Sequence, residues 1–480
     1  MQSASLSDAQ ALARHRLLWR WHFYAGLFVM PFLLVLAITG TLYCFQPQIE
    51  PLLYHDRMIV DARAEPRLSQ EVLLAKATAA ESRDATPATV VVNNDPRRSA
   101  EFVFKLESGT SESVFIDPYS GAVLGRLSVE NRLMKQIRNV HRGLLLGKTG
   151  EIVMELAGCW TLVMIATGVA LWWPKAQQKG GRFMPRLAST KGPAGRAWWR
   201  ELHAVGGAWL ALGALFFVLS GLPWSSTWGK QFKALATSAQ LGYPQGAWGN
   251  AHVHSAAPAP AMNMADPSMA GMKMDDLPLP QTPWAVGATH VPSSVPTSAA
   301  NSTNPTNPTI PLDQVIETAA QAGVNDGYDI ALPTTPQGVF TISYFPADPQ
   351  AERTLHIDRY SGQILSDIAY RDYGRVAQWI SYGTSLHMGR YFGVANQLLA
   401  SAISLGLAAM TVSGFVMWRR RKPGRAIGAP SRPTLNPPMR AWVIGLTALG
   451  IVFPLMGLTM LIVWLSDRVL FSPGKIASTR

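Results

Sequence analysis

Five long apolar runs restrict the folds open to this chain of 480 residues. Each run has about 20 residues or more with almost no charge, and a helix of that length crosses the roughly 30 Å hydrocarbon core of a bilayer. The first run is too long for a secretory signal and has no small-residue cleavage site, so we interpret it as a retained transmembrane helix. The sequence therefore predicts five spanning helices, over 23–46, 152–173, 204–224, 394–418 and 441–465.

The basic residues are concentrated between the apolar runs. A net charge of +12 would suit a nucleic-acid-binding protein, but segments 1–22, 174–202 and 419–440 hold 17 Lys and Arg against two acidic residues. Because basic loops stay in the cytoplasm, we predict a cytoplasmic N-terminus and two outer loops, 47–140 and 225–386. The charge encodes orientation in the lipid bilayer, and we expect no nucleic acid partner.

The only two cysteines, Cys44 and Cys159, both lie inside apolar runs. We interpret them as buried thiols. A disulfide between two helices is the alternative, and nothing in the sequence favours it.

The chain contains two copies of one unit. When His141 is aligned with His387, and His22 with His203, the residues that follow agree at equal spacings, as an ancient duplication would preserve them. The matched positions are Gly147 with Gly393, Gly168 with Gly414, Trp172 with Trp418, Gly26 with Gly207, and Thr39-Gly40 with Ser220-Gly221.

Each copy is expected to contain a helix, an outer domain and a second helix. Both copies begin and end in the cytoplasm, so an axis along the membrane normal relates them. Residues 68–82 have helical periodicity, and alternating strands follow in TVVVNND, EFVFKLE and SVFIDPYSG. We predict a helix on a short antiparallel sheet in each outer domain, with the shared IDxYSG as a hairpin turn rather than a catalytic motif. The run 441–465 has no counterpart and is assigned a packing role.

Several motifs resemble the PepSY-associated transmembrane family: the opening RWHFYAGL, the paired outer domains that end in IDxYSG, the HxxxxxG before the second helix of each half, and the LHxxxG of the third helix. The resemblance covers nearly the whole chain except about 240–310. It implies a multi-pass protein of the bacterial inner membrane, with PepSY domains in the periplasm. It also implies two b-type haems and reduction of ferric siderophores.

The predicted fold class is an α-helical membrane protein with five transmembrane helices, a duplicated helix–outer domain–helix unit plus one extra helix, and two small α+β PepSY-like domains. The predicted divisions are the N-terminus and first helix at 1–46, the first PepSY-like domain at 47–128, an outer His segment and second helix at 129–174, a basic loop at 175–202, the third helix at 203–224, a disordered insertion at 225–310, the second PepSY-like domain at 311–370, an outer His segment and fourth helix at 371–418, a basic loop at 419–440, the fifth helix at 441–466 and a periplasmic tail at 467–480.

Four of the ten histidines keep a histidine partner in the other copy, His22 with His203 and His141 with His387. A histidine that caps a helix at the membrane interface is the ordinary explanation of one such residue. Ionisable residues at a membrane boundary in both copies instead favour a functional site. A haem iron takes two axial imidazoles on opposite faces of a flat ring, whereas zinc needs four ligands. We therefore predict that each pair binds one haem b.

The neighbours of these histidines suit a haem. Gly26 and Gly207 lie one turn after His22 and His203, and a missing Cβ leaves room for the macrocycle. Nearby cations either hold the propionates or form a solvated rim, and the sequence leaves both open for Arg20, Arg138, Arg142, Lys148 and Arg390. Two haems along the membrane normal make an electron path to the periplasm. The chain has no dinucleotide loop, so we expect a separate electron donor on the cytoplasmic side.

An insertion at 244–310 belongs to neither copy and is rich in Pro, Ala, Ser, Thr and Asn, which predicts a disordered outer loop. Thioether and imidazole groups in it suit copper, especially Cu(I). A low-complexity tether that happens to contain methionine is the alternative. The possible copper ligands are His252, His254, Met262, Met264, Met269, Met272 and Met274.

The leading hypothesis is a transmembrane haem-dependent metal reductase that passes electrons to an oxidised metal species in the periplasm. The resemblance implies a ferric siderophore as that species, and the insertion adds copper as a variant. The alternative is a non-enzymatic membrane anchor or sensor whose outer domains bind a peptide or protein partner. That class does not require four duplicated histidines.

Overall fold

The computed structural model describes residues 2–178, 195–243, 272–294, 309–421, 428–433, 435 and 437–470. The chain divides into two compact units, and each takes segments from both sequence copies. We call them the helical unit, made of Met1–Tyr43, Arg138–Gln231 and Gln397–Arg480, and the sheet unit, made of Cys44–Ile137 and Phe232–Asn396.

In the part of the chain that the structure describes, four helices are long and apolar enough to cross a membrane. They follow the first four predicted spans, and each is extended by polar residues at one or both ends. Both cysteines are buried free thiols, as predicted. The four helices are α1 (Gln2–Cys44), α6 (Gly147–Gln178), α7 (Arg196–Gly221) and α11 (Val394–Arg421).

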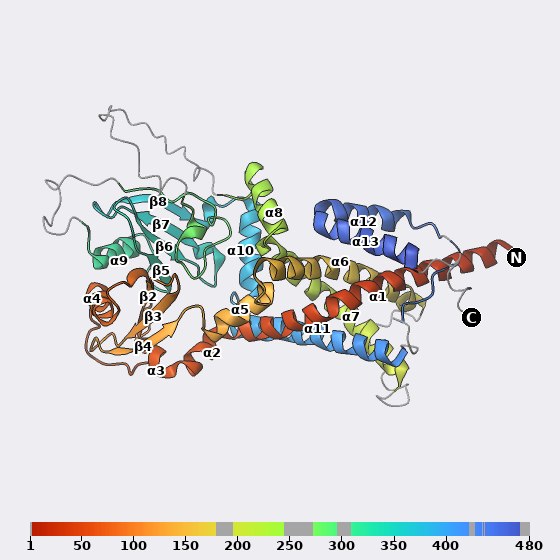
Figure 1. Ribbon diagram of the computed structural model, residues 1–480, viewed down its shortest axis with the longest axis horizontal. Coiled ribbons are helices and arrows are strands. Elements are labelled where there is room, and N and C mark those ends of the chain that lie inside the picture. The colour runs from red at the N-terminus through yellow and green to blue at the C-terminus, as the bar shows by residue number, and fades with distance from the viewer. Residues whose placement is uncertain are drawn as a thin grey trace, which may run out of the picture. The chain divides into compact units, whose positions relative to one another are not determined.

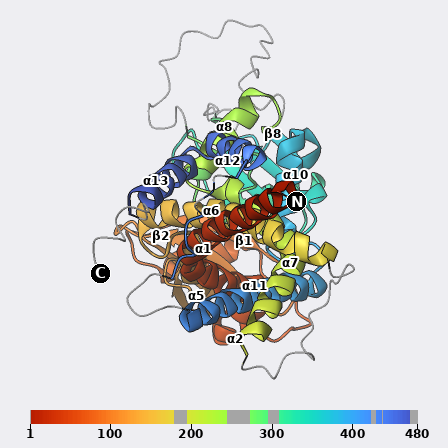
Figure 2. The same cartoon turned by 90° about the vertical axis from the view of Figure 1, so that its right-hand side faces the viewer.

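The fifth apolar run forms two short helices, α12 (Arg440–Val452) and α13 (Pro454–Leu470), instead of one. Pro454 ends the first helix because a proline disfavours helical backbone in the residue before it, and Phe453 has φ −120° and ψ 81°. Figures 1 and 2 show the two helices side by side. Their backbones meet near the turn, where a Cβ on Gly457 would lie 2.7 Å from the Gly450 carbonyl oxygen. The run is therefore a helical hairpin.

The segment ahead of this hairpin and the end of its second helix both contact Arg20 of α1. The Arg20 guanidinium donates to the Pro430 carbonyl, ahead of α12, and to the Asp467 carboxylate, near the end of α13. At about 1.5 Å per residue, the 13 residues of α12 span only about 20 Å. The fifth spanning helix that we expected at 441–466 is therefore two short helices in the structure, and α13 returns to the level where α12 begins. Most of the tail that we expected at 467–480 lies outside the described residues.

This hairpin predicts that the C-terminus lies on the same side of the membrane as the N-terminus. A compartment-sensitive reporter fused before residue 1 and one fused after residue 480 should report the same side. A reporter inserted at Ser108, in the loop between two strands of the sheet unit, should report the opposite side. Opposite sides for the two termini would contradict the hairpin.

The sheet unit contains one antiparallel sheet of eight strands in the order β4-β3-β2-β1-β5-β6-β7-β8. The first and second copies each supply four consecutive strands. The two sets of four strands join where β1 pairs with β5, with Val90 opposite Ile330. The two predicted outer domains thus share a single sheet. The strands are β1 (Thr86–Val92), β2 (Ala100–Lys105), β3 (Ser111–Ile116), β4 (Val123–Ser128), β5 (Tyr328–Ala331), β6 (Phe340–Tyr344), β7 (Arg353–Ile357) and β8 (Ile364–Ala369).

One face of this sheet packs on two equivalent helices, α4 (Gln70–Ala80) and α9 (Leu312–Gln321), as Figure 1 shows. Alternate strand residues point to this face and form the core, because successive side chains of a strand point to opposite faces. Phe102, Ile330 and Leu355 are fully buried there. The helix-on-sheet prediction is thus confirmed, although β4, β5 and β8 were not foreseen.

The IDxYSG motif is a turn in both copies, as predicted. Asp117 accepts hydrogen bonds from the backbone N–H groups of Tyr119 (2.9 Å) and Ser120 (3.3 Å). Asp358 accepts the equivalent bonds, with its shorter contact of 2.7 Å to Ser361 N. The motif joins β3 to β4 and β7 to β8 and serves a structural role.

The HxxxxxG spacing also has a backbone cause. The histidines lie at or near the ends of α5 (Leu133–Gly143) and α10 (Arg375–His387), and the glycines lie at the starts of α6 and α11. Gly147 and Gly393 both have φ +56°, a left-handed conformation that L side chains rarely adopt. The glycine therefore allows the sharp turn between the two helices of each pair.

Two parts of the segment 225–310 that we expected to be disordered are folded, the helix α8 (Trp228–Ser238) and residues 272–294. Residues 272–294 pack against the sheet, where Thr89 donates to the Pro278 carbonyl at 2.6 Å. Met274 is fully buried, as is the side chain of Val286. Further short elements are α2 (Gln46–Leu53), α3 (His55–Met58), η2 (Leu222–Trp224), α8 (Trp228–Ser238), η3 (Met274–Asp276), η5 (Pro349–Ala351) and η6 (Tyr370–Asp372).

Candidate functional site

Two of the four duplicated histidines face each other inside the helical unit. His22 comes from α1 and His203 from α7, the equivalent helices of the two copies. Their ring centroids are 6.2 Å apart, and the ring planes are inclined at 79°. The structure thus brings together the first pair predicted from the sequence.

Each of these rings is held through its Nδ1 atom by a hydroxyl from the second helix of its own copy. His22 Nδ1 lies 3.1 Å from Thr167 Oγ1 of α6, and His203 Nδ1 lies 2.8 Å from Ser413 Oγ of α11. Thr167 and Ser413 are equivalent residues of the repeat. The pseudo-symmetry therefore extends to the hydrogen bonds of the site.

These contacts determine which ring nitrogen carries the proton. The Thr167 hydroxyl donates its hydrogen to the Val163 carbonyl at 2.7 Å, so its oxygen can only accept from His22. His22 Nδ1 also lies 3.1 Å from the Met164 carbonyl, which has no hydrogen to give. Nδ1 must therefore be the donor, and Nε2 keeps the lone pair that a metal ion requires.

The same reasoning applies to His203 and to the third duplicated histidine, His141 of α5. Ser413 donates to the Met410 carbonyl at 2.8 Å and accepts from His203. Thr39 donates to the Val35 carbonyl at 2.6 Å and lies 2.9 Å from His141 Nδ1. All three imidazoles are thus oriented with Nε2 available.

A glycine follows each hydroxyl residue and provides the space for the ring. A Cβ on Gly168 would lie 3.1 Å from His22 Cε1, and one on Gly40 would lie 3.3 Å from His141 Cε1. For Gly414 the corresponding distance to His203 Cε1 is 3.5 Å. The sequence comparison matched these Ser/Thr-Gly pairs but assigned them no role, and this role in ring orientation was missed.

The glycines and arginines that the sequence predicted beside the haems can also be placed. A Cβ on Gly26 or on Gly207 would meet nothing within 4 Å, so the open space that we predicted beside both is present. Arg20 is engaged with Asp467, and Arg390 donates to the Phe345 carbonyl while its guanidinium lies 4.8 Å from the Phe345 ring centre. Neither arginine is thus a simple solvated rim residue.

His387 ends α10 and belongs to the sheet unit, whereas His141 belongs to the helical unit. The His387 carbonyl accepts a weak hydrogen bond from Cys44 Sγ at 3.8 Å. The pairing of His141 with His387 therefore stays a prediction from the repeat.

Most of the possible copper ligands lie outside the described residues, namely His252, His254, Met262, Met264 and Met269. Met272 is partly buried, and Met274 is fully buried in the folded segment 272–294. A thioether in that position serves as packing, so Met274 is unsuited to capture an ion from solution.

A buried carboxyl group fastens α10 to the sheet unit. Glu352, between η5 and β7, is 1% exposed and accepts a hydrogen bond from Ser381 Oγ at 3.0 Å. Its backbone carbonyl accepts from Tyr370 N at 3.1 Å. Ser385, one turn after Ser381, donates to the Ala347 carbonyl. The helix that carries His387 is thereby fixed to the end of the sheet.

Burial raises the pKa of Glu352 to about 7, although the Ser381 hydroxyl and Arg390 favour the charged form. In the unfolded chain the group should ionise near its ordinary value of 4.5. Between these two values the folded state binds more protons, so its stability should fall as pH rises from about 4.5 to about 7. One pKa unit corresponds to about 1.4 kcal/mol, so the loss is on the order of 2–3 kcal/mol.

Glu352→Gln should remove this dependence. We expect the midpoint of thermal unfolding of the full chain in detergent to change less between pH 5 and pH 7.5 in the variant than in the wild type. Glu317→Gln, an exposed position on α9, serves as the control and should keep the wild-type dependence. An unchanged pH dependence in Glu352→Gln would contradict the assignment.

Comparison with family models gives one match, to the PepSY-associated TM region, over residues 19–421. This match includes all four duplicated histidines and all of the Ser/Thr-Gly pairs. No curated protein matches the chain.

Proposed function

Because the chain belongs to the PepSY-associated transmembrane family, we propose that it is a haem-dependent reductase of the bacterial inner membrane. In this proposal it passes electrons across the membrane to an oxidised metal species in the periplasm. Two b-type haems, one for each histidine pair, form the path. When bound, they supply one-electron redox chemistry.

The observation that carries the proposal is the geometry of His22 and His203. Two imidazoles on opposite sides of one metal ion, with metal–nitrogen bonds of about 2 Å, have ring centroids roughly 6 Å apart. The measured separation is 6.2 Å, and both rings keep Nε2 free of a proton. A bis-histidine haem needs this arrangement, whereas two capping histidines do not.

The chain's own residues prepare the site for such a ligand. Thr167 and Ser413 select the tautomer and the ring orientation, as the outer hydrogen-bond partners of metal-binding histidines generally do. Gly168 and Gly414 let the rings approach the helix backbone, and the space beside Gly26 suits a flat ring. No hydrogen bond has to be exchanged when the metal binds.

A second site follows from the repeat. Thr39 orients His141 and leaves its Nε2 available. By the sequence register, Ser220-Gly221 is the counterpart of Thr39-Gly40, and His387 is the counterpart of His141. We propose that His141 and His387 share the second haem.

The direction of transfer rests on the distribution of charge. Basic segments at 1–22, 174–202 and 419–440 favour a cytoplasmic position for the level of His22 and His203. Electrons would enter there from a separate donor and leave at the periplasmic side. The family resemblance favours ferric siderophore as the acceptor.

Copper remains the second candidate substrate in this proposal. The methionines and histidines of 252–272 have the soft ligand types that Cu(I) prefers. Without Met274, which is packed into the folded segment, the candidate set is smaller than the sequence predicted.

The competing proposal, a membrane anchor or sensor that binds a peptide or protein, makes no use of three histidines oriented in the same way. A visible spectrum of the purified protein separates the two. Split α bands of low-spin haem b support the reductase, and a colourless preparation eliminates it.

His203→Ala should remove about half of the bound haem. One of the two axial ligands of the inner haem is lost, while His141 and His387 are untouched. The haem-to-protein ratio measures the loss, and the spectrum of the second haem should be unchanged. His55→Ala, at an exposed position of the sheet unit, is the control and should retain both haems. Loss of both haems from a well-folded His203→Ala protein would contradict the pairing.

Thr167→Val should weaken the inner haem site without removing a ligand. The change keeps the side-chain shape but deletes the acceptor for His22 Nδ1, and loss of such partners typically costs about 10- to 100-fold in metal affinity. We expect faster haem loss to a haem-scavenging protein and shifted low-spin signals in electron paramagnetic resonance. Thr161→Val is the matched control on the same helix, since its hydroxyl bonds only the Ala157 carbonyl. Equal behaviour of the two variants would show that Thr167 does not position His22.

A further inference from the structure

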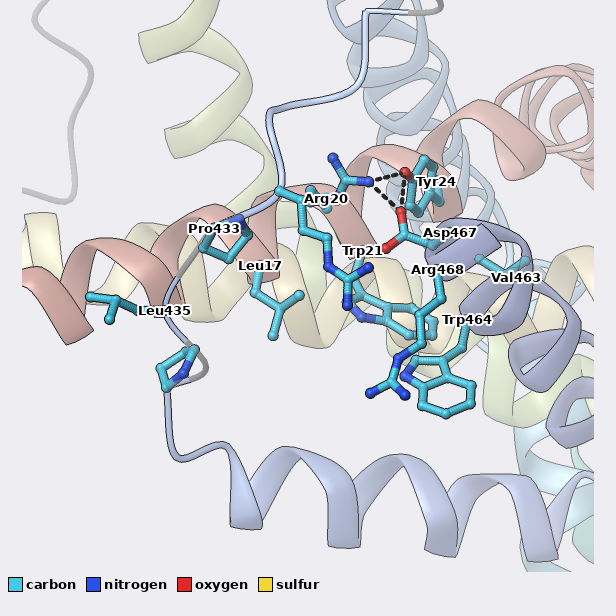
Figure 3. Close-up of a pocket in the computed structure, with 12 residues that line it drawn as sticks. Leu17, Arg20, Trp21, Tyr24, Pro433, Leu435, Val463, Trp464, Asp467 and Arg468 are labelled. Atoms are coloured by element: carbon cyan, nitrogen blue, oxygen red, sulfur yellow. Dashed lines mark hydrogen bonds and ion pairs between the residues drawn. The ribbon is translucent and has the colours of Figure 1, made fainter. Parts of the chain in front are cut away.

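A pocket lies between α1, the segment ahead of α12, and α13. Its volume is about 120 Å³, a little below the roughly 150 Å³ of an engineered protein cavity that binds a single benzene ring. Trp21, which lines it, directly precedes His22 in the chain, so the pocket lies at the level of the inner histidine pair. Figure 3 shows the lining side chains, which come from the range 17–24 of α1, the range 463–468 of α13, and Arg432, Pro433, Leu435 and Pro437 ahead of α12.

One end of the pocket is a buried hydrogen-bonded group. Arg20 is 3% exposed and donates to Tyr24 Oη at 2.7 Å and to Asp467 Oδ1. Tyr24 Oη also donates to Asp467 Oδ1 at 2.6 Å. Both donors use the same carboxylate oxygen. Within the described residues, the hydrogen bonds of Asp467 leave its Oδ2 without a donor, and Asp467 lines the pocket (Figure 3).

The walls of the pocket combine flat aromatic rings with charged groups. The Trp21 indole lies nearly parallel to Trp160, with centroids 6.2 Å apart and an angle of 17°. The Arg468 guanidinium lies 4.0 Å from the Trp464 ring centre, so its planar face covers the indole. Leu17 and Val463 complete the apolar lining. A flat ring with one or two hydroxyl groups matches these walls.

We propose that this pocket binds the head group of a membrane quinol and that the quinol is the electron donor. This inference rests on the proposed function. A quinol ring stacks between the aromatic walls, donates its hydroxyl to Asp467 Oδ2, and extends its apolar tail into the bilayer. Each quinol loses two electrons and two protons to become a quinone, and reduces two ferric haem irons to the ferrous state. Asp467 Oδ2 accepts the proton of the hydroxyl that it binds and passes it to the aqueous side, and the proton of the second hydroxyl is released directly to water.

An anionic lipid head group is the competing occupant, because Arg432 and Arg468 also line the pocket. The free carboxylate oxygen opposes it, since a phosphate there would face the negative charge of Asp467. A neutral hydrogen-bond donor has no such conflict. The observations therefore favour the quinol.

Photolabelling with an azidoquinone tests the pocket directly in full-length protein held in phosphatidylcholine nanodiscs. We expect label on residues 17–24 and 463–468, displaced by excess unlabelled quinone. Asp467→Asn should weaken binding roughly 10- to 100-fold, because a hydrogen bond to a charged acceptor is lost. Trp464→Ala, which leaves the Arg20–Asp467 pair intact, should also weaken it.

Trp442→Ala is the matched control. Trp442 lines a second, apolar depression on α12 with Val163 and Leu446, where a hydrophobic probe would bind without specificity. Label that concentrates there, or that phosphatidylglycerol displaces and quinone does not, would overturn the proposal.

In haem-loaded protein, Asp467→Asn should slow reduction by a short-chain quinol at least about tenfold and leave reduction by dithionite unchanged. Equal quinol rates in both proteins would also overturn it.

Labelling needs no haem, so its result decides the pocket independently. A haem-free preparation would eliminate the proposed function, while specific label in the pocket would still establish a quinone site.

Discussion

The hydrogen bond between a serine or threonine hydroxyl and an imidazole Nδ1 determines what the helical unit can bind. The hydroxyl has already given its hydrogen to a carbonyl one turn back or less, so it acts only as an acceptor. The histidine must then donate from Nδ1, and its other nitrogen faces the interior with a free lone pair. Three histidines obey this rule with the same side-chain chemistry. A buried imidazole of fixed tautomer is costly to arrange, which makes a structural accident a poor explanation of three of them.

The glycine that follows each hydroxyl residue also helps to position the imidazole ring. It lets the ring lie against the neighbouring helix: a Cβ on Gly168 or Gly40 would crowd the facing ring, whereas a Cβ on Gly414 would make an ordinary contact. Pairing a hydroxyl with a glycine therefore controls both the rotation and the depth of the imidazole. The result is a set of rings held in fixed orientations, which would lose little entropy on binding a ligand.

Much of this architecture follows from sequence patterns. The apolar runs predicted four helices correctly because each has the uniform hydropathy of a long buried span, and the repeat identified His22 and His203 as a pair. The fifth run has the same hydropathy, but Pro454 interrupts it, and composition alone does not register a break of one residue. The turn and strand patterns predicted the helices and most strands of the outer domains. They did not predict the pairing of β1 with β5, because strand partners far apart in the chain leave no local signal. The roles of Thr39, Thr167 and Ser413 were hidden for a similar reason, since a hydroxyl on an apolar helix also bonds its own backbone.

The β1–β5 pairing has a consequence for how such a protein could arise. The strands run antiparallel with Val90 opposite Ile330 and Val91 opposite Asp329, a register that a strand could form with a second copy of itself. A chain holding only one copy would thus complete its sheet by dimerising through that edge, and an unpaired edge strand invites such pairing. In that dimer neither protomer alone would hold both inner histidines. Fusion into one chain removes the concentration dependence of the site. It also frees the halves to differ, so that Phe115 and His356 occupy equivalent positions and only the second copy carries the insertion.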